Sequence, residues 1–358
     1  MVRSRNDNES WRDCIPVTIN GMEQDTESAI QHLRTALPFR DGMLDAEHRC
    51  ALRLFNGFYE GIPGLAIDIY ARTLVIFNQA EPADRVEMLL PGILEFCRQR
   101  YAWIESVLLK TRATPDLEAR RGILLTGREP DRKVREHGVW YALDLTMNQD
   151  ASLYLDTRGL RKWLIENTRG KSVLNTFAYT GSLGAAACAG GAQPVVQSDL
   201  NRRFLNLGKT TCSLNGFPVR KADFISGDFF ACTARFRREG RTFDCVILDP
   251  PFFSDTAGGR VDLAANSERL INKVRPLVND GGILVVINNA LYVSGAAWMA
   301  ALKGLCAEGY TALEALIPAP EDITGFPGTK CGAPPVDTAP FNHSTKIAVL
   351  KVRRKISA

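Results

Sequence analysis

The stretch Val173-Leu-Asn-Thr-Phe-Ala-Tyr-Thr-Gly-Ser-Leu-Gly-Ala-Ala-Ala187 decides how this chain folds. Its apolar start predicts a strand, its middle a sharp turn, and its run of small residues a helix. Gly181 can adopt backbone angles that a Cβ forbids, and its missing side chain lets a ligand approach the main chain. Gly184 allows the helix to pack closely on the sheet, and the helix N-terminus directs free N–H groups at any ligand in the crevice. A plain strand–turn–helix unit without a ligand has the same pattern, because a Gly-x-x-Gly spacing alone is weak evidence.

Strands and helices alternate from about residue 146 to the end, which is typical of a parallel sheet with helices on both faces. The sequence therefore predicts an α/β, Rossmann-like domain over residues 146–358, with a seven-stranded, mostly parallel sheet. The predicted strands span residues 172–177, 194–199, 221–226, 243–249 and 283–288, followed by 310–317 and 345–352 as a closing hairpin.

Residues 46–145 have a different pattern, which predicts a small α+β domain with a possible role in substrate or RNA recognition. Residues 1–45 are expected to form an N-terminal arm, loose over Met1–Ser10, with a short helix over 28–37 that Pro38 ends. The glycine-rich segment 57–65 is interpreted as a tight connection between strands rather than as a ligand loop. The elements expected in the small domain are strands at 50–55, 65–70, 73–78 and 103–110, a helix at 82–101 and a charged loop at 129–138.

The composition is that of an ordinary globular protein, with 45% hydrophobic residues, 23% charged residues and a net charge of +4. The nine cysteines are an odd number without a Cys-x-x-Cys pair, so neither a disulfide framework nor a metal site is expected. No secretory signal and no apolar run of ~18 residues is found, so a cytoplasmic protein without a membrane segment is predicted. Because the net charge is mild, local clusters of Arg and Lys would have to supply any nucleic-acid contact, although such clusters are more often solvated faces.

Two predicted strands lead into carboxylates at the edge where an open parallel sheet binds its ligands. Asp199 lies about twenty residues after the glycine turn, where a carboxylate can accept hydrogen bonds from both hydroxyls of a ribose. Asp228 can accept a hydrogen bond from an adenine amino group while Phe229 covers the ring. The alternative interpretation makes both aspartates plain helix N-caps.

The sharpest motif is Asp249-Pro250-Pro251-Phe252-Phe253, directly after a predicted strand. The two prolines stiffen the chain and remove two N–H donors, which leaves a carboxylate and backbone carbonyls facing the cleft. An aromatic ring beside them can stack on a planar acceptor group. We therefore predict that Asp249, Pro250, Pro251 and Phe252 are catalytic, against the alternative of a solvated Asp-Pro turn.

The segment Leu153-Tyr-Leu-Asp-Thr-Arg158 precedes the first strand of this sheet. The guanidinium of Arg158 can hold a ligand carboxylate, and Asp156 can pair with a ligand ammonium group. A surface ion pair at the start of a helix is the alternative interpretation.

Together these segments resemble the class I methyltransferases that act on large-subunit ribosomal RNA, of the I and K types. The resemblance rests on 153–158, 173–181, Gly190-Gly-Ala192, Asp199, Leu214-Asn-Gly216 and Leu248-Asp-Pro-Pro251, and it extends weakly over 50–145. It implies a Rossmann-like class I methyltransferase domain with S-adenosylmethionine as cofactor and RNA as partner. By matching position, Asp199 would bind the ribose, Asp228 and Phe229 the adenine, and Asp249 to Phe252 would face the donor and the target. The complete set of candidate cofactor-binding residues is Tyr154, Asp156, Arg158, Asn175, Phe177, Ala178, Gly181, Asp199, Leu200, Asp228, Phe229 and Asp249.

The sequence departs from the family pattern in three places. The I type usually begins with an RNA-binding PUA domain, which residues 1–45 do not resemble, and the family's Lys-Thr-Gly is here Asp150-Ala151-Ser152. The enzymes that make 5-methylcytosine have a cysteine after the fifth strand, which attacks the ring as a thiolate. Here that place reads Ile287-Asn288-Asn289-Ala290, and Cys245 is expected in the core. The missing cysteine argues against a ring-carbon mechanism. The Asn288-Asn289 pair is closer to the K type, which methylates a guanine ring nitrogen, so the resemblance implies a base nitrogen in ribosomal RNA as the acceptor.

Other functions remain open on sequence alone. They are methyl transfer to a protein or small molecule, a nicotinamide-dependent oxidoreductase and a non-catalytic RNA-binding protein. The oxidoreductase would need a Gly-x-Gly-x-x-Gly turn, which Gly181-Ser-Leu-Gly184 lacks. A homodimer is a possible assembly. His343 can lie over the cleft, although such a histidine more often caps a loop.

Overall fold

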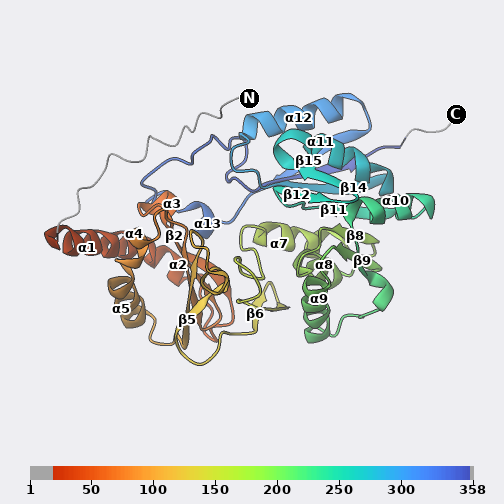
Figure 1. The fold of residues 1–358 in the computed structure, drawn as a ribbon. Coiled ribbons are helices and arrows are strands. Elements are labelled where there is room, and N and C mark those ends of the chain that lie inside the picture. The colour runs from red at the N-terminus through yellow and green to blue at the C-terminus, as the bar shows by residue number, and fades with distance from the viewer. Residues whose placement is uncertain (1–18, 355–358) are drawn as a thin grey trace.

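The computed structural model describes residues 19–354, in which two sheets lie side by side with their helices (Figure 1). The loose stretch predicted at Met1–Ser10 lies outside the described residues. Across the described part of the chain, no helix is long and apolar enough to cross a membrane.

The large sheet has seven strands in the order β10-β9-β8-β11-β14-β16-β15. Adjacent strands pair in parallel from β10 to β14, while β16 runs antiparallel to both of its neighbours. The predicted seven-stranded, mostly parallel sheet with its closing hairpin is thus confirmed. The strands are β8 (Val173–Thr176), β9 (Val195–Asp199), β10 (Phe224–Ser226), β11 (Phe243–Leu248), β14 (Val278–Asn288), β15 (Thr311–Ile317) and β16 (Lys346–Val352).

Helices cover both faces of the large sheet, because each face is apolar. Leu160, Leu183 and Ala186 pack in one core cluster with strand residues such as Val173 and Ile247. A second cluster joins the other face to helices later in the chain. The helices are α7 (Arg158–Asn167), α8 (Ser182–Ala189), α9 (Arg202–Leu214), α10 (Phe229–Arg238), α11 (Leu263–Val274) and α12 (Gly295–Ala307), with short 3₁₀ turns η1 (Lys221–Asp223) and η2 (Arg275–Leu277).

The turn between β8 and α8 has the geometry that its sequence predicts. Gly181 has φ +76°, in the left-handed region that favours glycine. A Cβ on Gly184 would lie 2.4 Å from the Gln197 side chain on β9, so only glycine permits this helix to sit so close to the sheet. A Cβ on Gly181 would likewise lie 2.6 Å from Gln197 Oε1. The missing side chain of Gly181 therefore serves close packing within the protein.

The small sheet has five strands in sequence order, β1 to β5, with a parallel pair only between β3 and β4. A crossover through two helices joins that parallel pair, as parallel pairing requires. The elements are β1 (Ala51–Asn56), α3 (Gly57–Glu60), β2 (Leu65–Tyr70), β3 (Thr73–Asn78), α4 (Asp84–Glu87), α5 (Leu90–Arg100), β4 (Ser106–Thr111), α6 (Leu117–Arg121) and β5 (Ile123–Thr126).

The helix predicted over 28–37 is longer than expected. It runs over Ile19–Ala36 as α1, and Pro38 begins a further short helix, α2 (Pro38–Asp41), at the position where proline is tolerated. Leu33 and Leu37 are buried in the core of the small sheet. The described part of the predicted arm therefore packs on that sheet, and the division into an arm and two domains stays a prediction.

The structure contains two hairpins that the sequence did not predict. The charged segment 129–138 contains β6 (Lys133–Glu136), which pairs with β7 (Val139–Ala142). His137 and Gly138 between them have φ of +49° and +82°, the two positive values of a tight two-residue hairpin turn. The second hairpin, β12 (Phe253–Thr256) with β13 (Gly259–Asp262), directly follows the Asp-Pro-Pro motif.

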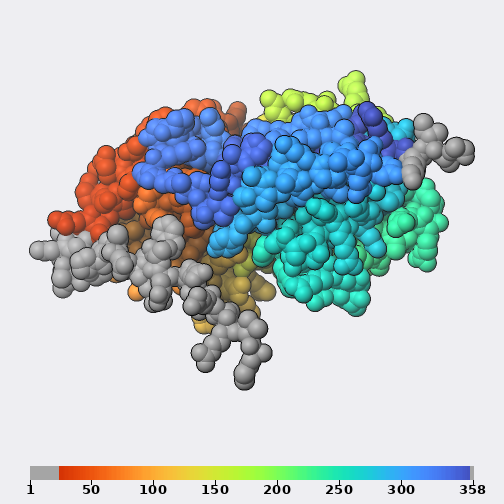
Figure 2. Space-filling view, turned by 90° about the horizontal axis from the view of Figure 1, so that it is seen from above, coloured from red at the N-terminus to blue at the C-terminus, as the bar shows by residue number. Residues whose placement is uncertain are grey.

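The connection between β15 and β16 crosses to the small sheet, where its short helix α13 (Glu321–Thr324) contacts β1. Figure 2 shows this blue segment against the red and orange surface of the N-terminal part. Its Asp322 is fully buried and accepts hydrogen bonds from Arg158 Nη1 at 2.8 Å and from the Arg53 backbone N–H at 2.9 Å. One carboxylate thus joins α13 to both α7 and β1.

Glu136 on β6 extends this buried network. It accepts a two-point hydrogen bond from Arg161, at 2.6 and 2.9 Å, and a third from Arg158 at 3.3 Å. Burial alone would raise the pKa of Glu136, but the two guanidinium groups lower it overall, so this carboxylate is ionised.

Asp322→Asn should destabilise the protein by about 3 kcal/mol, because it leaves the buried Arg158 charge with too little compensation. The free energy of unfolding in urea measures this. Glu27→Gln, which breaks the exposed Arg34–Glu27 pair, is the matched control and should cost less than about 1 kcal/mol. If both variants lose the same small amount of unfolding free energy, Asp322 does not stabilise the fold as the structure implies.

Candidate functional site

A cavity of about 610 Å³ opens at the carboxyl ends of the parallel strands. Asp199 after β9, Asp228 after β10 and Asp249 after β11 all line it, although they are far apart in the sequence. The segment 148–157 before α7 forms another wall. The predicted convergence of these three carboxylates on one cavity is therefore confirmed.

Aromatic rings line the cavity beside Asp228. Phe177 and Phe229 stack with ring centroids 4.5 Å apart, and Phe230 packs edge-on against Phe229. Asp228 is the N-cap of α10, since its Oδ1 accepts hydrogen bonds from the backbone N–H groups of Phe230 and Ala231. Its Oδ2 accepts a hydrogen bond from the Thr256 hydroxyl. The N-cap alternative is thus confirmed, in a residue that also faces the cavity.

Asp199 is held rigidly at the end of β9. Its two oxygens accept hydrogen bonds from the backbone N–H groups of Tyr179 and Asn201, each at 2.8 Å. Burial raises its pKa, although these two N–H groups oppose the shift. Tyr179 and Phe177 have φ of +50° and +54°, which is unusual for aromatic residues, so the loop that faces Asp199 is strained.

Asp249 is the cavity carboxylate with the most perturbed pKa. Burial, reinforced by the charge of Asp156, raises the pKa of Asp249 from 3.8 to about 7. No hydrogen bond joins its side chain to another described residue. Pro250 and Pro251 follow without N–H donors, and the Asn289 amide donates to the Pro250 carbonyl at 3.3 Å. Asp249 can therefore accept or release a proton near neutral pH.

Phe252 completes the Asp-Pro-Pro motif as an open aromatic surface. Its ring lines the cavity and is 51% exposed, and the next residue, Phe253, is 50% exposed under the Arg260 guanidinium. Exposed phenylalanine rings at a cavity mouth can stack on a planar ligand.

The wall formed by residues 148–157 carries further polar groups. The Tyr154 hydroxyl donates to Asp150 Oδ2 at 3.1 Å, and the Tyr154 ring lies 5.1 Å from that of Tyr179. Asp156 accepts a hydrogen bond from the Thr345 hydroxyl through Oδ2, while its buried Oδ1 has no partner. Such an orphaned acceptor is suited to a ligand that brings a donor or a positive charge.

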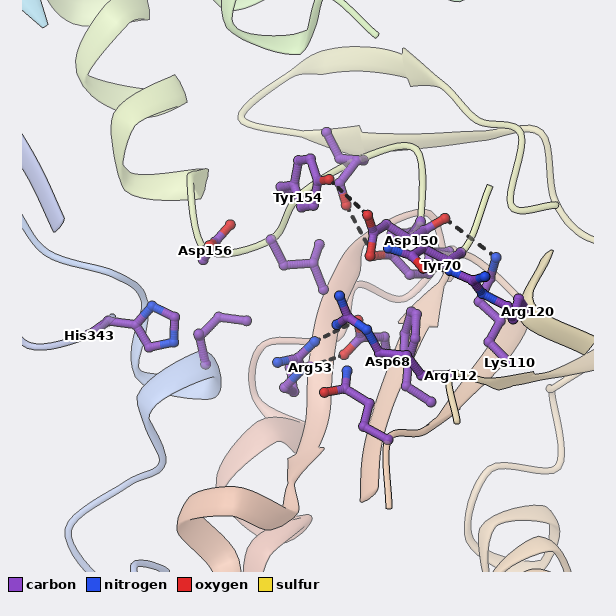
Figure 3. Close-up of a pocket in the computed structure, with 17 residues that line it drawn as sticks. Arg53, Asp68, Tyr70, Lys110, Arg112, Arg120, Asp150, Tyr154, Asp156 and His343 are labelled. Carbon is purple, nitrogen blue, oxygen red and sulfur yellow. Dashed lines mark hydrogen bonds and ion pairs between the residues drawn. The ribbon is translucent and has the colours of Figure 1, made fainter. Parts of the chain in front are cut away.

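A second, smaller cavity of about 130 Å³ adjoins the first on the side of the small sheet (Figure 3). Arg53 pairs with Asp68 at 2.7 Å in its wall. The buried Lys110 ammonium donates to backbone carbonyls of Arg121 and Asn148, and burial lowers its pKa to about 8. The residues that line both cavities are Arg112, Gln149, Asp150, Tyr154 and Asp156.

His343 lies in the wall of this smaller cavity (Figure 3). Burial lowers its pKa to about 4, so the ring is neutral at physiological pH. Its Nδ1 accepts a hydrogen bond from the Thr345 N–H at 3.1 Å. The residue thus both orders its own loop and faces a cavity.

Four predicted binding residues do not line the main cavity, and the clearest case is Arg158. The expectation that it reaches a ligand carboxylate is not met, because its guanidinium is held by Asp322, Glu136 and the Ala51 carbonyl. The other three are Asn175, Ala178 and Gly181, all of which are buried in the packing around β8 and the turn after it. The predicted residues that do line it are Tyr154, Asp156, Phe177, Asp199, Leu200, Asp228, Phe229, Asp249, Pro250, Pro251 and Phe252.

Sequence analysis also missed residues that line the cavity. Tyr179 and Asn289 stand within quoted segments, but no role was assigned to them. Arg112 and Thr345 reach the cavity from the end of β4 and from the segment before β16, and no motif marks either.

The family model for S-adenosylmethionine-dependent methyltransferases matches residues 65–302, more than half of the chain. The chain belongs to this family. A relative named ribosomal RNA large subunit methyltransferase I, from Photobacterium profundum, is 31% identical over 259 residues, which cover 72% of this chain and 64% of the relative. A relative of the same name from Aliivibrio fischeri is 29% identical over 263 residues, 73% of this chain and 66% of the relative. The chain thus matches slightly less than two thirds of each relative's length.

Solved structures confirm the fold of this methyltransferase. A protein described as a methyltransferase complexed with SAH superimposes with a TM-score of 0.78 at 20% identity, covering 94% of this chain and 83% of that one. A protein described as a SAM-dependent methyltransferase from Streptococcus mutans has a TM-score of 0.74 at 19% identity, covering 95% and 83%.

The main cavity fits S-adenosylmethionine, the cofactor of this family. Its volume of about 610 Å³ lies within the range of small-molecule sites. The stacked Phe177–Phe229 pair can cover an adenine, and the Asp199 carboxylate can accept from hydroxyl groups. The cavity carboxylates and the orphaned Asp156 Oδ1 suit a ligand that carries a sulfonium and an ammonium group. In this family, the cofactor supplies a methyl group on positively charged sulfur.

Asp249→Asn should stabilise the protein at high pH. Between pH 3.8 and about 7, the folded state keeps a proton on Asp249 that the unfolded chain has released. The free energy of unfolding of the wild type should therefore fall as pH rises through this window. The variant lacks this loss, so its advantage over the wild type should grow to about 4 kcal/mol by pH 8.

Urea unfolding at pH 4, 6 and 8 measures this advantage. Asp255→Asn, at a solvent-exposed carboxylate, is the control and should change little at any of the three. A stability difference between the wild type and D249N that does not vary with pH would show that Asp249 ionises normally.

Proposed function

We propose that this methyltransferase transfers the methyl group of S-adenosylmethionine to a base nitrogen in ribosomal RNA. The observation that carries the proposal is the Asp249-Pro250-Pro251-Phe252 turn, which brings an unpartnered carboxylate and an exposed aromatic ring into the cavity. The names of the relatives that match over most of this chain support ribosomal RNA as the substrate.

The residues at the strand ends each hold a different part of the methyl donor. Asp199 accepts hydrogen bonds from the ribose hydroxyls while its own carboxylate is fixed by Tyr179 and Asn201. Phe177 and Phe229 cover the adenine. Asp228 faces the adenine edge, although both of its oxygens already accept hydrogen bonds from protein groups. Its contribution to adenine binding is therefore weaker than that of an unpartnered carboxylate.

The acceptor side rests on Phe252 and Asp249. A base that leaves its helix can stack on the exposed Phe252 ring and present its edge to Asp249. The base nitrogen attacks the methyl carbon in line, the carbon–sulfur bond breaks, and its electron pair stays on sulfur. Asp249, with a pKa of about 7, then accepts the proton that the nitrogen loses. The protein mainly aligns the partners and excludes water.

Attack by nitrogen rather than by a ring carbon is supported by the cavity lining. Methylation at a pyrimidine carbon uses a thiolate to activate the ring. Among the described residues that line the two cavities there is no cysteine. Cys245 lies in β11 with no exposed surface, and burial raises its pKa to about 12, so it stays a neutral core residue.

Transfer of tritium from labelled S-adenosylmethionine tests the acceptor. An unmodified large-subunit ribosomal RNA transcript and total cell protein are offered separately, and labelled nucleosides are identified by mass analysis. We expect label in RNA, in a nucleoside methylated on a base nitrogen, and about a hundredfold less transfer for D249N, in line with the loss of a general base.

Two results would contradict the proposal. Label that enters protein but not RNA would exclude the RNA acceptor. A nucleoside methylated on a ring carbon would exclude the nitrogen chemistry, even if the RNA acceptor were correct.

A further inference from the structure

The main cavity has an uneven charge distribution. Five of its lining residues are aspartates, at positions 150, 156, 199, 228 and 249, whereas Arg112 is the one basic residue among the described residues that line it. The aspartates suit the sulfonium, ammonium and hydroxyl groups of the donor. The donor also carries a carboxylate, which would be repelled by this lining unless a cation met it.

Arg158 cannot supply this cation, because Asp322 and Glu136 already bind its guanidinium. Other cations near the adjoining cavity are engaged too. Arg53 is paired with Asp68, the Lys110 ammonium donates to backbone carbonyls, and Arg120 donates to Gln149 at 2.8 Å.

Arg112 is different, since its guanidinium makes no hydrogen bond or ion pair with any residue of the described range 19–354. Its backbone N–H donates to the Asn78 carbonyl at 2.8 Å, which anchors the residue directly after β4. Figure 3 shows it on the small-sheet wall, opposite Tyr154 and Asp156. A planar donor group without a protein partner, on a fixed backbone, is suited to bind a carboxylate.

The orientation of the donor places its carboxylate at this end of the cavity. Phe229 lies after β10, Asp199 ends β9 and Phe177 follows β8, so the nucleoside would be held at this side of the sheet. The amino-acid chain must then extend toward Asp249 and the segment 148–157. Arg112 lines both cavities together with Asp150, Tyr154 and Asp156, so it lies where the chain ends.

We propose that Arg112, a residue of the small sheet, binds the α-carboxylate of S-adenosylmethionine and so completes the donor site across the junction of the two sheets. This inference rests on the proposed use of the main cavity for the donor. It gives the N-terminal part of the chain a role in donor binding in addition to any contact with RNA.

Isothermal titration calorimetry with two ligands tests this assignment. S-adenosylmethionine and its decarboxylated form differ only in the α-carboxylate. For Arg112→Ala, we expect binding of S-adenosylmethionine to weaken about 10- to 100-fold, as for loss of a charge-assisted hydrogen bond, and binding of the decarboxylated form to change less than about twofold.

Arg121→Ala is the matched control. It removes the same charge from the same region, but Arg121 lines neither cavity, so both affinities should stay at the wild-type values. The Arg112 side chain has no partner to lose, so R112A should also keep the wild-type melting temperature.

Each other outcome overturns the assignment in a distinguishable way. If R112A binds both ligands as the wild type does, the carboxylate is held elsewhere, for instance by N–H groups at the start of α7. If R112A keeps its affinity for S-adenosylmethionine but loses affinity for RNA, the guanidinium binds a phosphate instead. If the wild type binds neither ligand, the proposed function fails, and this inference fails with it.

Discussion

The buried ion-pair network around Asp322 is the interaction on which the rest of the structure depends. It joins Arg158 on α7 to the small sheet through the Arg53 N–H and the Ala51 carbonyl. Glu136 extends it to Arg161, which is fully buried. Charges in such surroundings are tolerated only when every partner is present, so the two sheets are tied in one arrangement.

This arrangement matters because the functional cavity is not built from the large sheet alone. The end of the cavity that we propose for the nucleoside is lined by the carboxyl ends of parallel strands, but the opposite end also includes Arg112 from the small sheet and Thr345 from the segment before β16. A shift of one sheet against the other would separate Arg112 from Asp156, with which it lines both cavities. The network around Asp322 therefore helps to fix the shape of this cavity, although Asp322 does not line it.

The carboxylates of the cavity have different surroundings, which suit them to the different tasks that we propose for them. Asp199 and Asp228 accept hydrogen bonds from backbone N–H groups, which makes them rigid acceptors. Asp249 has no such donors, and burial with the nearby charge of Asp156 holds its pKa near 7. A positively charged ligand beside it would favour its ionised form, which ties the protonation state of Asp249 to the occupancy of the cavity.

Local sequence patterns predicted the large sheet and the positions of Asp199, Asp228 and Asp249 well, because alternation of strands and helices brings parallel strand ends to one edge. They failed for Arg158, whose partner Asp322 lies 164 residues away in α13, a four-residue helix without a sequence signal. They also missed the hairpin over 133–142, since its turn residues His137-Gly138 stand within a charged run. Arg112 had no signal, because its role depends on how two separately patterned regions pack together.

Hydrogen–deuterium exchange with and without S-adenosylhomocysteine tests the central claim, that one donor site spans both sheets, most directly. We predict slower exchange on ligand addition in segments 148–157, 177–181, 199–203 and 227–231 of the large-sheet part, and also in 110–113 of the small-sheet part. Protection confined to the large-sheet segments, with 110–113 unchanged, would contradict the claim.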